Sequence, residues 1–277
     1  MMKSCKICNS ERLKEISIGK ERLFFCFNCS IYYNIKFPTQ DELKNYYSKE
    51  FSPIPDNIKF IEYRRLLLYP EQQRLIEMLI KFKPPPAKIL DIGCDRCYFI
   101  DEARRYGYEV KGVEISERSR NFCSKINIET YKSIDEVEDN FDIITLWHSL
   151  EHLSEPLNYL QNLLCRIKDD GLICIRVPNF DSFWRKLLRS RWIWFQPQNH
   201  LFHYTKKSLQ NLLNLTGYKI LFIKSQKPNN FLTLFAGLLS IIIHMKREKI
   251  FQKMKTILKL FYEYLTGVEI IAVCKKN

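Results

Sequence analysis

The sequence predicts an α/β fold in which a doubly wound, mostly parallel sheet carries helices on both faces. The first observation is the segment Lys88–Phe99, KILDIGCDRCYF, whose apolar run, glycine turn and helical start are typical of a strand–turn–helix unit. The second is that further short apolar runs alternate with helical patterns downstream. The third is a final apolar run, Val268–Lys275, which predicts an antiparallel strand added to the parallel sheet.

The composition limits the class of protein. The chain has 277 residues, of which 46% are apolar, so it can bury a core and a disordered protein is excluded. Lys and Arg number 44 against 31 Asp and Glu, which gives a net charge of +13. This excess favours an acidic partner, such as nucleic acid, an anionic membrane surface or a phosphorylated substrate. A basic surface without any partner accounts for the charge equally well.

Two segments bear on location. The N-terminal residues MMKSCKIC contain no apolar signal segment, which indicates a cytoplasmic protein. The longest apolar run, Phe231–Ile243, is shorter than the roughly 18 residues that indicate a membrane span. Because basic residues follow it, the segment 231–260 is compatible with peripheral contact at the inner face of a membrane, or with a lid or a dimer face.

The N-terminal segment has the spacing of a four-thiolate metal site. It contains two short pairs, Cys5-x-x-Cys8 and Cys26-x-x-Cys29. Each pair can present two sulfurs from a tight turn, and four soft ligands complete the tetrahedron that Zn²⁺ prefers. We therefore predict a structural zinc site at Cys5, Cys8, Cys26 and Cys29, with four reduced structural cysteines as the alternative.

Three parts are predicted along the chain: a zinc-ribbon module at 1–36, a helical connector at 37–83, and an α/β domain at 84–277 with a helical insertion at about 229–266. In the connector, Thr39 and Glu42 form the signature of a capping box. A second helix is predicted over Ile58–Phe82, with a break at Pro70.

In the third part, strands and helices alternate. Helices are expected from Tyr98, from Glu117, from Pro156 and after the cap residue Thr205, and a turn is expected at Asp169–Gly171. The seven expected strands are Ile89–Ile92, Tyr108–Ile115, Ile128–Tyr131, Phe141–Leu146, Leu172–Val177, Tyr218–Ser225 and Val268–Lys275.

The turn after the first strand is the predicted cofactor site. Small molecules bind beyond the carboxyl ends of the strands in doubly wound sheets, which places Asp91–Cys97 against a ligand. Glu114 ends the second strand, some twenty residues after Asp91, at the usual distance of a carboxylate that binds ribose hydroxyls.

At this point the chain resembles the class I S-adenosylmethionine-dependent methyltransferases, which have a Rossmann-like, seven-stranded sheet. The resemblance is carried by LDIGCDRCYFI, GVEIS, FDIITLWHSLEHLSEP, DDGLICIRVPN and NHLFHYT. Within that class the chain is similar to the subgroup with an N-terminal four-cysteine zinc ribbon. The match spans almost the whole chain, least clearly 229–266.

The resemblance implies roles for individual residues. Asp91 and Gly93 would hold the methionine part of S-adenosylmethionine, Glu114 the ribose, and Ile115 would pack on the adenine. Trp147 and His148 would line the other side of the cofactor. The complete set of expected cofactor-binding residues is Asp91, Gly93, Cys94, Asp95, Phe99, Glu114, Ile115, Trp147 and His148.

The chain departs from the family pattern where Asp95 and Cys97 replace glycines. Glycine allows the sharp bend and the close approach of a ligand, so both replacements predict weaker cofactor binding. Asp tolerates a left-handed backbone better than most residues, whereas the Cys97 side chain would need space where none is expected. The resulting Cys94-x-x-Cys97 pair is interpreted as a coincidence rather than a redox or metal site.

Methyl transfer to carbon or oxygen also needs a base for the proton of the acceptor. His200 is the first candidate, because it lies in the long segment after the fifth strand, and His152 is the second. His203 is a weaker candidate, and Glu151 is expected to cap its own helix. For each histidine, a purely structural role in a loop is the alternative.

The sequence therefore predicts methyl transfer to a small molecule. The resemblance implies a sugar or another small metabolite, and a nucleotide-sugar or a lipid-linked intermediate is the expected form of the acceptor. Aromatic and basic residues alternate over Phe180–Phe195, as suits a phosphorylated or nucleotide-linked acceptor, or else a helix that packs its aromatics inward. One alternative is a binding protein that has lost catalysis. Another is an RNA methyltransferase, which is not favoured because Pro178-Asn179 follows the fifth strand and not the fourth. No oligomeric state is predicted.

Overall fold

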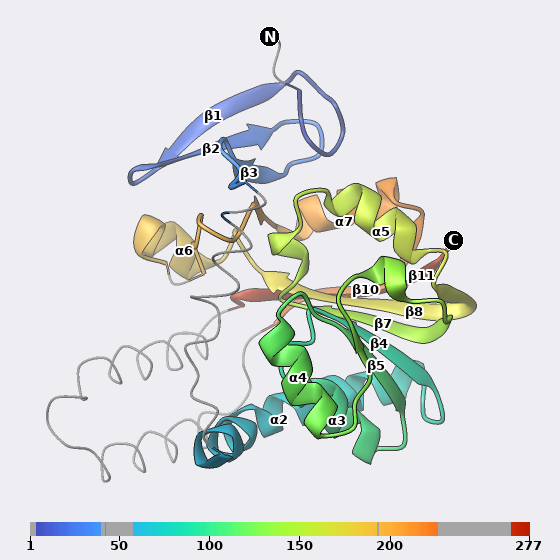
Figure 1. Ribbon diagram of the computed structural model, residues 1–277. Helices are drawn as coiled ribbons and strands as arrows, with labels where there is room; N and C mark the ends of the chain where they lie inside the picture. The colour runs from blue at the N-terminus through green and yellow to red at the C-terminus, as the bar shows by residue number, and fades with distance from the viewer. Residues whose placement is uncertain (1–3, 40–41, 43–57, 193, 227–266) are drawn as a thin grey trace, which may run out of the picture.

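The computed structural model describes residues 4–39, 42, 58–192, 194–226 and 267–277. Within these residues the chain forms two sheets, one of seven strands and one of four. Figure 1 shows the smaller sheet above the larger one, with helices on both faces of the larger sheet.

The seven-stranded sheet has the order β10-β11-β8-β7-β4-β5-β6. Strands β8, β7, β4, β5 and β6 are mutually parallel, and β11 lies antiparallel between β8 and β10. The predicted fold class, including the antiparallel last strand, is confirmed. The strands are β4 (Lys88–Ile92), β5 (Glu109–Val113), β6 (Thr130–Tyr131), β7 (Phe141–Trp147), β8 (Ile167–Pro178), β10 (Tyr218–Gln226) and β11 (Glu269–Lys276).

Both faces of this sheet are buried, because neighbouring side chains on a strand point to opposite sides. Ile89 and Ile143 pack among residues of the helices α2, α3 and α4, whereas Leu90 and Ile144 pack among those of α5 and α7. Burying such a side chain contributes roughly 1.5–3 kcal/mol. The helices are α2 (Ile58–Phe82), α3 (Tyr98–Arg105), α4 (Glu117–Lys125), α5 (Pro156–Leu163) and α7 (Lys206–Leu215).

Two predicted interruptions are wrong. Helix α2 runs through Pro70 without a break, because Leu75, Ile76 and Leu79 beyond the proline are buried against the sheet and outweigh one missing hydrogen bond. The expected turn at Asp169–Gly171 lies inside β8, which begins at Ile167. Exposed polar residues at a strand end were therefore mistaken for a turn.

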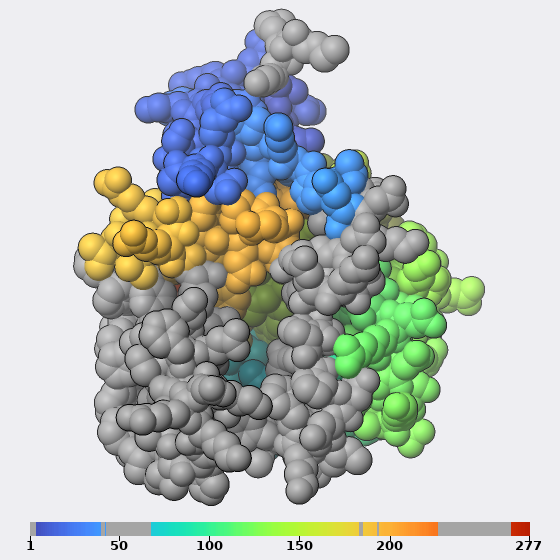
Figure 2. All heavy atoms as spheres, turned by 60° about the vertical axis from the view of Figure 1, so that its left-hand side comes forward, coloured from blue at the N-terminus to red at the C-terminus, as the bar shows by residue number. Residues whose placement is uncertain are grey.

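The N-terminal sheet is completed by a strand from the far end of the chain. The order of strands in this sheet is β1-β2-β3-β9. Along the chain, β9 (Phe202–His203) comes after β8, the last of the five parallel strands of the larger sheet. The register pairs Tyr32 with His203 and Tyr33 with Phe202. Figure 2 shows the ribbon, in blue, seated on the yellow and orange segment that contains β9. The ribbon strands are β1 (Leu13–Ile18), β2 (Glu21–Cys26) and β3 (Tyr32–Asn34).

The aromatic segment after β8 also packs on the ribbon. Phe180, Trp192 and Phe195 are buried together with Ile18 and Leu23 of the ribbon, and they flank helix α6 (Phe183–Leu188). Of the two interpretations of this segment, the structure favours inward packing of the aromatics.

Thr39 and Glu42 exchange the two hydrogen bonds of the predicted capping box. The remainder of that helix, the expected insertion at 229–266 and the segment 231–260 lie outside the described residues. Among the helices that are described, none combines the length and the apolar character needed to cross a bilayer.

Candidate functional site

The predicted cofactor turn begins where β4 ends. Gly93 has φ +74°, and its N–H donates to the carbonyl of Val113 at 2.8 Å, which ties the turn to β5. A Cβ at this position would meet Ser149 Oγ at 2.5 Å. Both the backbone angle and the neighbouring hydroxyl therefore require glycine.

The two residues that replace glycine in this turn adopt the glycine conformation. Asp95 has φ +47° and Cys97 has φ +58°, so both lie in the left-handed region. The Cys97 side chain finds its space toward α4, where its sulfur is bonded to Cys123. The expectation that the two replacements weaken cofactor binding stays a prediction.

Three sulfurs gather beneath this turn. Cys94 Sγ lies 3.7 Å from Cys97 Sγ, and Cys97 forms a disulfide with Cys123. The disulfide joins Cys97 to Cys123 and leaves Cys94 a free thiol, so the interpretation of Cys94-x-x-Cys97 as a coincidence stays a prediction. The third cysteine could not be inferred from spacing, because it comes from the next helix and meets the pair only through the crossover.

Asp91 is the buried acid of the site. It is 4% exposed, and Thr145 on the neighbouring strand β7 donates to its Oδ1 at 2.7 Å. Burial raises the pKa of Asp91 to about 7, although the hydrogen bond from Thr145 acts in the opposite direction. A positively charged ligand would restore the ionised form.

Glu114 lies across the turn from Asp91. Its two carboxylate oxygens accept the backbone N–H groups of Asp95, at 3.0 Å, and of Ser116, at 2.8 Å. Burial raises its pKa, and these backbone bonds partly offset the effect. Directly beyond it, Ile115 is 55% exposed. The structure therefore brings Asp91, Asp95 and Glu114 together at the carboxyl ends of β4 and β5.

Two further expected cofactor residues contact each other. Phe99 in the first turn of α3 packs edge-on against Trp147 at the end of β7, with ring centroids 5.4 Å apart. Together they form an aromatic wall next to the turn.

His148 follows β7 and sits in a charged, buried environment. Its Nε2 lies 2.9 Å from Glu269 Oε1 and its Nδ1 lies 3.4 Å from Glu151 Oε1, while its ring stacks on Trp194 at 4.9 Å. Burial disfavours the charged ring, but the two carboxylates outweigh it and raise the pKa of His148 to about 10. The two carboxylates therefore favour the imidazolium form of His148.

The sequence analysis did not identify the residues around His148. Arg176 on β8 donates its Nε to Glu269 Oε2 at 2.8 Å, and it also contacts Glu71 on α2. A usable signal was present: the acid Glu269 directly precedes the apolar run Ile270–Cys274 in the last strand.

The two expected catalytic histidines meet beside Glu151. His152 Nδ1 lies 2.9 Å from the carbonyl of Asn199, and His200 Nδ1 lies 2.8 Å from the carbonyl of Trp194. Their ring centroids are 4.8 Å apart. Burial lowers the pKa of His200 to about 3, so the ring is neutral.

Glu151 does not cap a helix, contrary to expectation. It lies in the short 3₁₀ turn Leu150–His152, and α5 begins only after Glu155. Its carboxylate is 1% exposed, and neither oxygen has a hydrogen-bond partner among the described residues. The nearest cation among them is His148.

His203 has a structural role. It lies in β9, its Nε2 is 3.1 Å from Asn34 Oδ1, and the Asn34 amide donates to the carbonyl of His200 at 3.0 Å. The pair therefore holds the segment around His200 against the ribbon.

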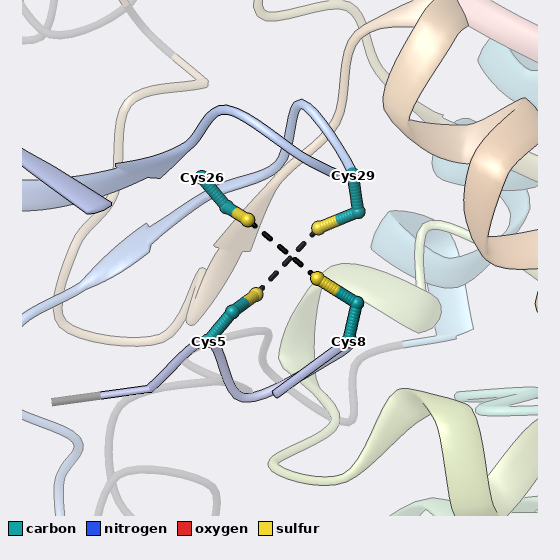
Figure 3. A group of neighbouring side chains, drawn as sticks. All are labelled: Cys5, Cys8, Cys26 and Cys29. Carbon is teal, nitrogen blue, oxygen red and sulfur yellow. Dashed lines mark hydrogen bonds between the residues drawn. The ribbon is translucent and has the colours of Figure 1, made fainter. Parts of the chain in front are cut away.

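Figure 3 shows the four ribbon cysteines converging on one point. Cys5 Sγ and Cys29 Sγ are 3.5 Å apart, and Cys8 Sγ and Cys26 Sγ are 3.6 Å apart. A zinc ion bound by four thiolates at about 2.3 Å has sulfur–sulfur distances of about 3.8 Å. The residues present therefore fit a tetrahedral metal site with little movement.

Comparisons with known proteins agree with this geometry. A family model described as a methyltransferase domain matches residues 60–222, more than half of the chain. A ubiquinone biosynthesis O-methyltransferase of Actinobacillus pleuropneumoniae is 29% identical over 107 residues, which cover 33% of this chain and 46% of the relative. The chain thus spans about half the length of the curated relatives it matches.

Solved structures share the fold. A SAM-dependent methyltransferase from Archaeoglobus fulgidus superimposes with a TM-score of 0.52 at 20% identity, covering 74% of this chain and 94% of that one. The plantazolicin methyltransferase BpumL in complex with SAH gives a TM-score of 0.51 at 18% identity, covering 85% and 96%. With the family model covering most of the seven-stranded sheet, the chain belongs to the methyltransferase domain family.

Proposed function

We propose that this protein binds S-adenosylmethionine and transfers its methyl group to a small-molecule acceptor. The observation that carries the proposal is the pair of buried carboxylates, Asp91 and Glu114, on either side of a turn with three left-handed residues. A carboxylate pair suits a ligand with cationic and hydroxyl groups, and it disfavours a pyrophosphate. The family membership supports the same activity.

The proposed cofactor-binding residues lie on two sides of S-adenosylmethionine. Asp91, Gly93 and the turn hold the methionine end, Glu114 binds the ribose and Ile115 packs on the adenine. Cys94, Asp95 and Phe99 complete the turn, and Trp147 with His148 forms the opposite wall. S-adenosylmethionine supplies a methyl group on a sulfonium, whose leaving group is a neutral thioether. The protein therefore mainly aligns the acceptor and excludes water.

His200, followed by His152, is proposed as the base on the acceptor side. The His200 Nδ1 proton is donated to the carbonyl of Trp194, so Nε2 carries the lone pair that can accept a proton. The matched relatives are named O-methyltransferases, which supports a hydroxyl acceptor. The exposed Arg189 and Arg191 near Trp194 suit an acceptor with a phosphate or nucleotide group, such as a nucleotide-sugar or a lipid-linked intermediate.

Isothermal titration with S-adenosylmethionine and S-adenosylhomocysteine tests the cofactor site. We expect binding of both ligands, and a loss of at least about tenfold in affinity for Glu114→Gln, because one charge-assisted hydrogen bond is worth about 1.5–3 kcal/mol. The matched control is Glu117→Gln, an exposed residue in the first turn of α4. If neither ligand produces heat or a thermal shift, the protein is a binding module that has kept only the fold.

We also propose that the ribbon carries one structural zinc ion, because its four sulfurs already lie near tetrahedral distances. The hydrogen bond with Cys29 lowers the pKa of Cys5 to about 5, which favours a thiolate ligand at neutral pH. Elemental analysis of the purified protein should give one zinc ion per chain from this site, and its absence would rule the site out.

A further inference from the structure

We propose a second metal site, formed by Glu151, His152 and His200, that binds a divalent cation through one carboxylate and two imidazoles. One potential ligand atom from each residue lies within 4.8 Å of the other two. The site lies beyond the carboxyl ends of β7 and β8, next to the stacked pair of His148 and Trp194. It shares no residue with the cysteine site of the ribbon.

The first support is the carboxylate of Glu151. It is 1% exposed, and within the described part of the chain its oxygens accept no hydrogen bond. A buried ionised carboxylate without such partners costs several kcal/mol and requires a nearby cation. His148 lies 3.4 Å away, but it is closer to Glu269, at 2.9 Å, and is shared between the two.

The second support is the distribution of positive charge around the site. Arg176 is shared in the same way, because it contacts both Glu71 and Glu269. His148 and Arg176 thus contact the three carboxylates of Glu71, Glu151 and Glu269, and the charge of Arg74 also acts on Glu269. Glu71 is partly solvated, with a side chain 37% exposed, whereas Glu151 is enclosed. Of these three carboxylates, Glu151 therefore has the weakest compensation.

The third support is the orientation of the histidines. Each directs Nδ1 at a backbone carbonyl, that of Asn199 for His152 and that of Trp194 for His200. Ligating histidines almost always donate their other ring N–H in this way, which fixes the tautomer and the ring. The segment that carries these two acceptors is held to the ribbon, since Asn34 donates to the carbonyls of Pro197 and His200 within it or next to it.

The donor set specifies the class of cation. Two imidazoles and one carboxylate suit Zn²⁺, Mn²⁺ or Fe²⁺, and three protein ligands leave coordination positions for solvent or substrate. This resembles a catalytic rather than a closed structural site. On the basis of the proposed function, an acceptor hydroxyl bound there would lose its proton to solvent more readily before it receives the methyl group. With the ion bound, His152 and His200 would be ligands, and neither ring would then act as the base.

Mn²⁺ is the probe, because it prefers oxygen and nitrogen ligands and leaves the thiolate site of the ribbon occupied by zinc. Full-length protein is titrated calorimetrically, and its zinc content is measured before and after. We expect one Mn²⁺ per chain with no loss of zinc. Loss of a residue that only hydrogen-bonds a metal ligand lowers metal affinity by about 10–100-fold. Glu151→Gln and His200→Gln each remove a ligand, so each should lower the affinity for Mn²⁺ by more than that.

The matched control is Glu71→Gln, which makes the same substitution in the same charged cluster but away from the three ligands. It should keep the affinity for Mn²⁺ within a few-fold. An equal loss in Glu71→Gln and Glu151→Gln would mean that the cluster attracts cations only through its net charge, and it would overturn the site.

Pulsed electron paramagnetic resonance on the unmodified protein provides a readout that does not depend on the folding of a variant. Bound Mn²⁺ should show hyperfine coupling to the ¹⁴N nuclei of imidazole. No ¹⁴N coupling, or no Mn²⁺ binding together with a zinc content that never exceeds one per chain, refutes the proposal. Because these measurements need no S-adenosylmethionine, a failure of cofactor binding would refute the proposed function and leave the metal site intact.

Discussion

Asp91 shows how one side chain couples binding to stability. Its pKa is raised from 3.8 to about 7 in the folded protein, because it is buried and the like charge of Glu114 adds to the effect, while the hydrogen bond from Thr145 opposes it. The folded state therefore holds the proton more tightly than the unfolded state, and this contribution to stability is lost as the pH rises through about 7. At neutral pH and above, the site keeps a charge that opposes folding.

Asp91→Asn should therefore raise the free energy of unfolding by about 1–3 kcal/mol at pH 8, since a neutral amide avoids the cost of the buried charge. The difference should shrink at pH 5, where Asp91 in the folded wild type is already protonated. Urea denaturation at both pH values measures it. A variant that is less stable than wild type at pH 8 would show that the carboxylate has a compensating partner.

The affinity for S-adenosylmethionine should rise with pH through about 7, because the ionised form of Asp91 attracts the cationic cofactor. Titration calorimetry between pH 6 and 8 checks this. In Asp91→Asn the affinity should be low at every pH. If the affinity of the wild-type protein does not change over this range, Glu114 rather than Asp91 attracts the positively charged cofactor.

Among the elements, the junction of α3 and α4 combines a strained backbone with a covalent link. Cys97 is the N-cap of α3 in the left-handed region, and Cys123 lies in α4. Reducing this disulfide should lower the free energy of unfolding by about 2–4 kcal/mol. Thermal denaturation with and without reductant tests this, and an unchanged midpoint would contradict it.

Cys97→Gly and Cys123→Ala both remove the disulfide, but only Cys97→Gly also changes the residue in the left-handed conformation. Comparing them separates the effect of the disulfide from that of the backbone strain. Cys97→Gly should be the more stable of the two by about 0.5–1 kcal/mol, because glycine adopts the left-handed conformation without steric cost. Chemical denaturation under reducing conditions compares them. If Cys123→Ala is equally stable, the angle at position 97 carries no strain.

Local signals predicted the elements well, and contacts between distant segments were predicted poorly. Periodicity and short spacing predicted the succession of strands along the chain, the cap at Thr205 and the convergence of the ribbon cysteines. Glu151 was misassigned because His200, whose ring lies beside its carboxylate, is far away in the sequence. The β3–β9 pairing was equally inaccessible, since a strand of two residues has no periodicity.

At the scale of the whole molecule, the ribbon supports the candidate site. Asn34, at the end of β3, donates to the His200 carbonyl and bonds the His203 ring, while β9 forms the fourth strand of the ribbon sheet. The ribbon core is also continuous with one face of the seven-stranded sheet. Asn34 and His203 are 169 residues apart in the sequence, so this contact joins distant parts of the chain. Loss of the ribbon metal should therefore also disturb the site around His200.

Cys8→Ser should lower the melting temperature by several degrees, because it removes one thiolate from a site that supplies folding energy to a small module. It should also weaken Mn²⁺ binding, since the segment of His200 loses its anchor. Differential scanning calorimetry and the Mn²⁺ titration test both effects. Cys165→Ser, at an exposed free cysteine, is the control and should change neither. A Cys8→Ser protein with an unchanged affinity for Mn²⁺ would separate the two sites.

The fourth ribbon strand has a consequence for the newly made chain. Synthesis proceeds from the N-terminus, so the residues of β1, β2 and β3 leave the ribosome long before those of β9. During that interval β3 has an open edge, and open edges are where strands of other chains add. Early capture of the ion by the cysteines would fix this small sheet in shape, and the late arrival of Phe202 and His203 would close it. The maturation of the nascent polypeptide is thus ordered in time, because the ribbon is translated before β9 and is completed only after it.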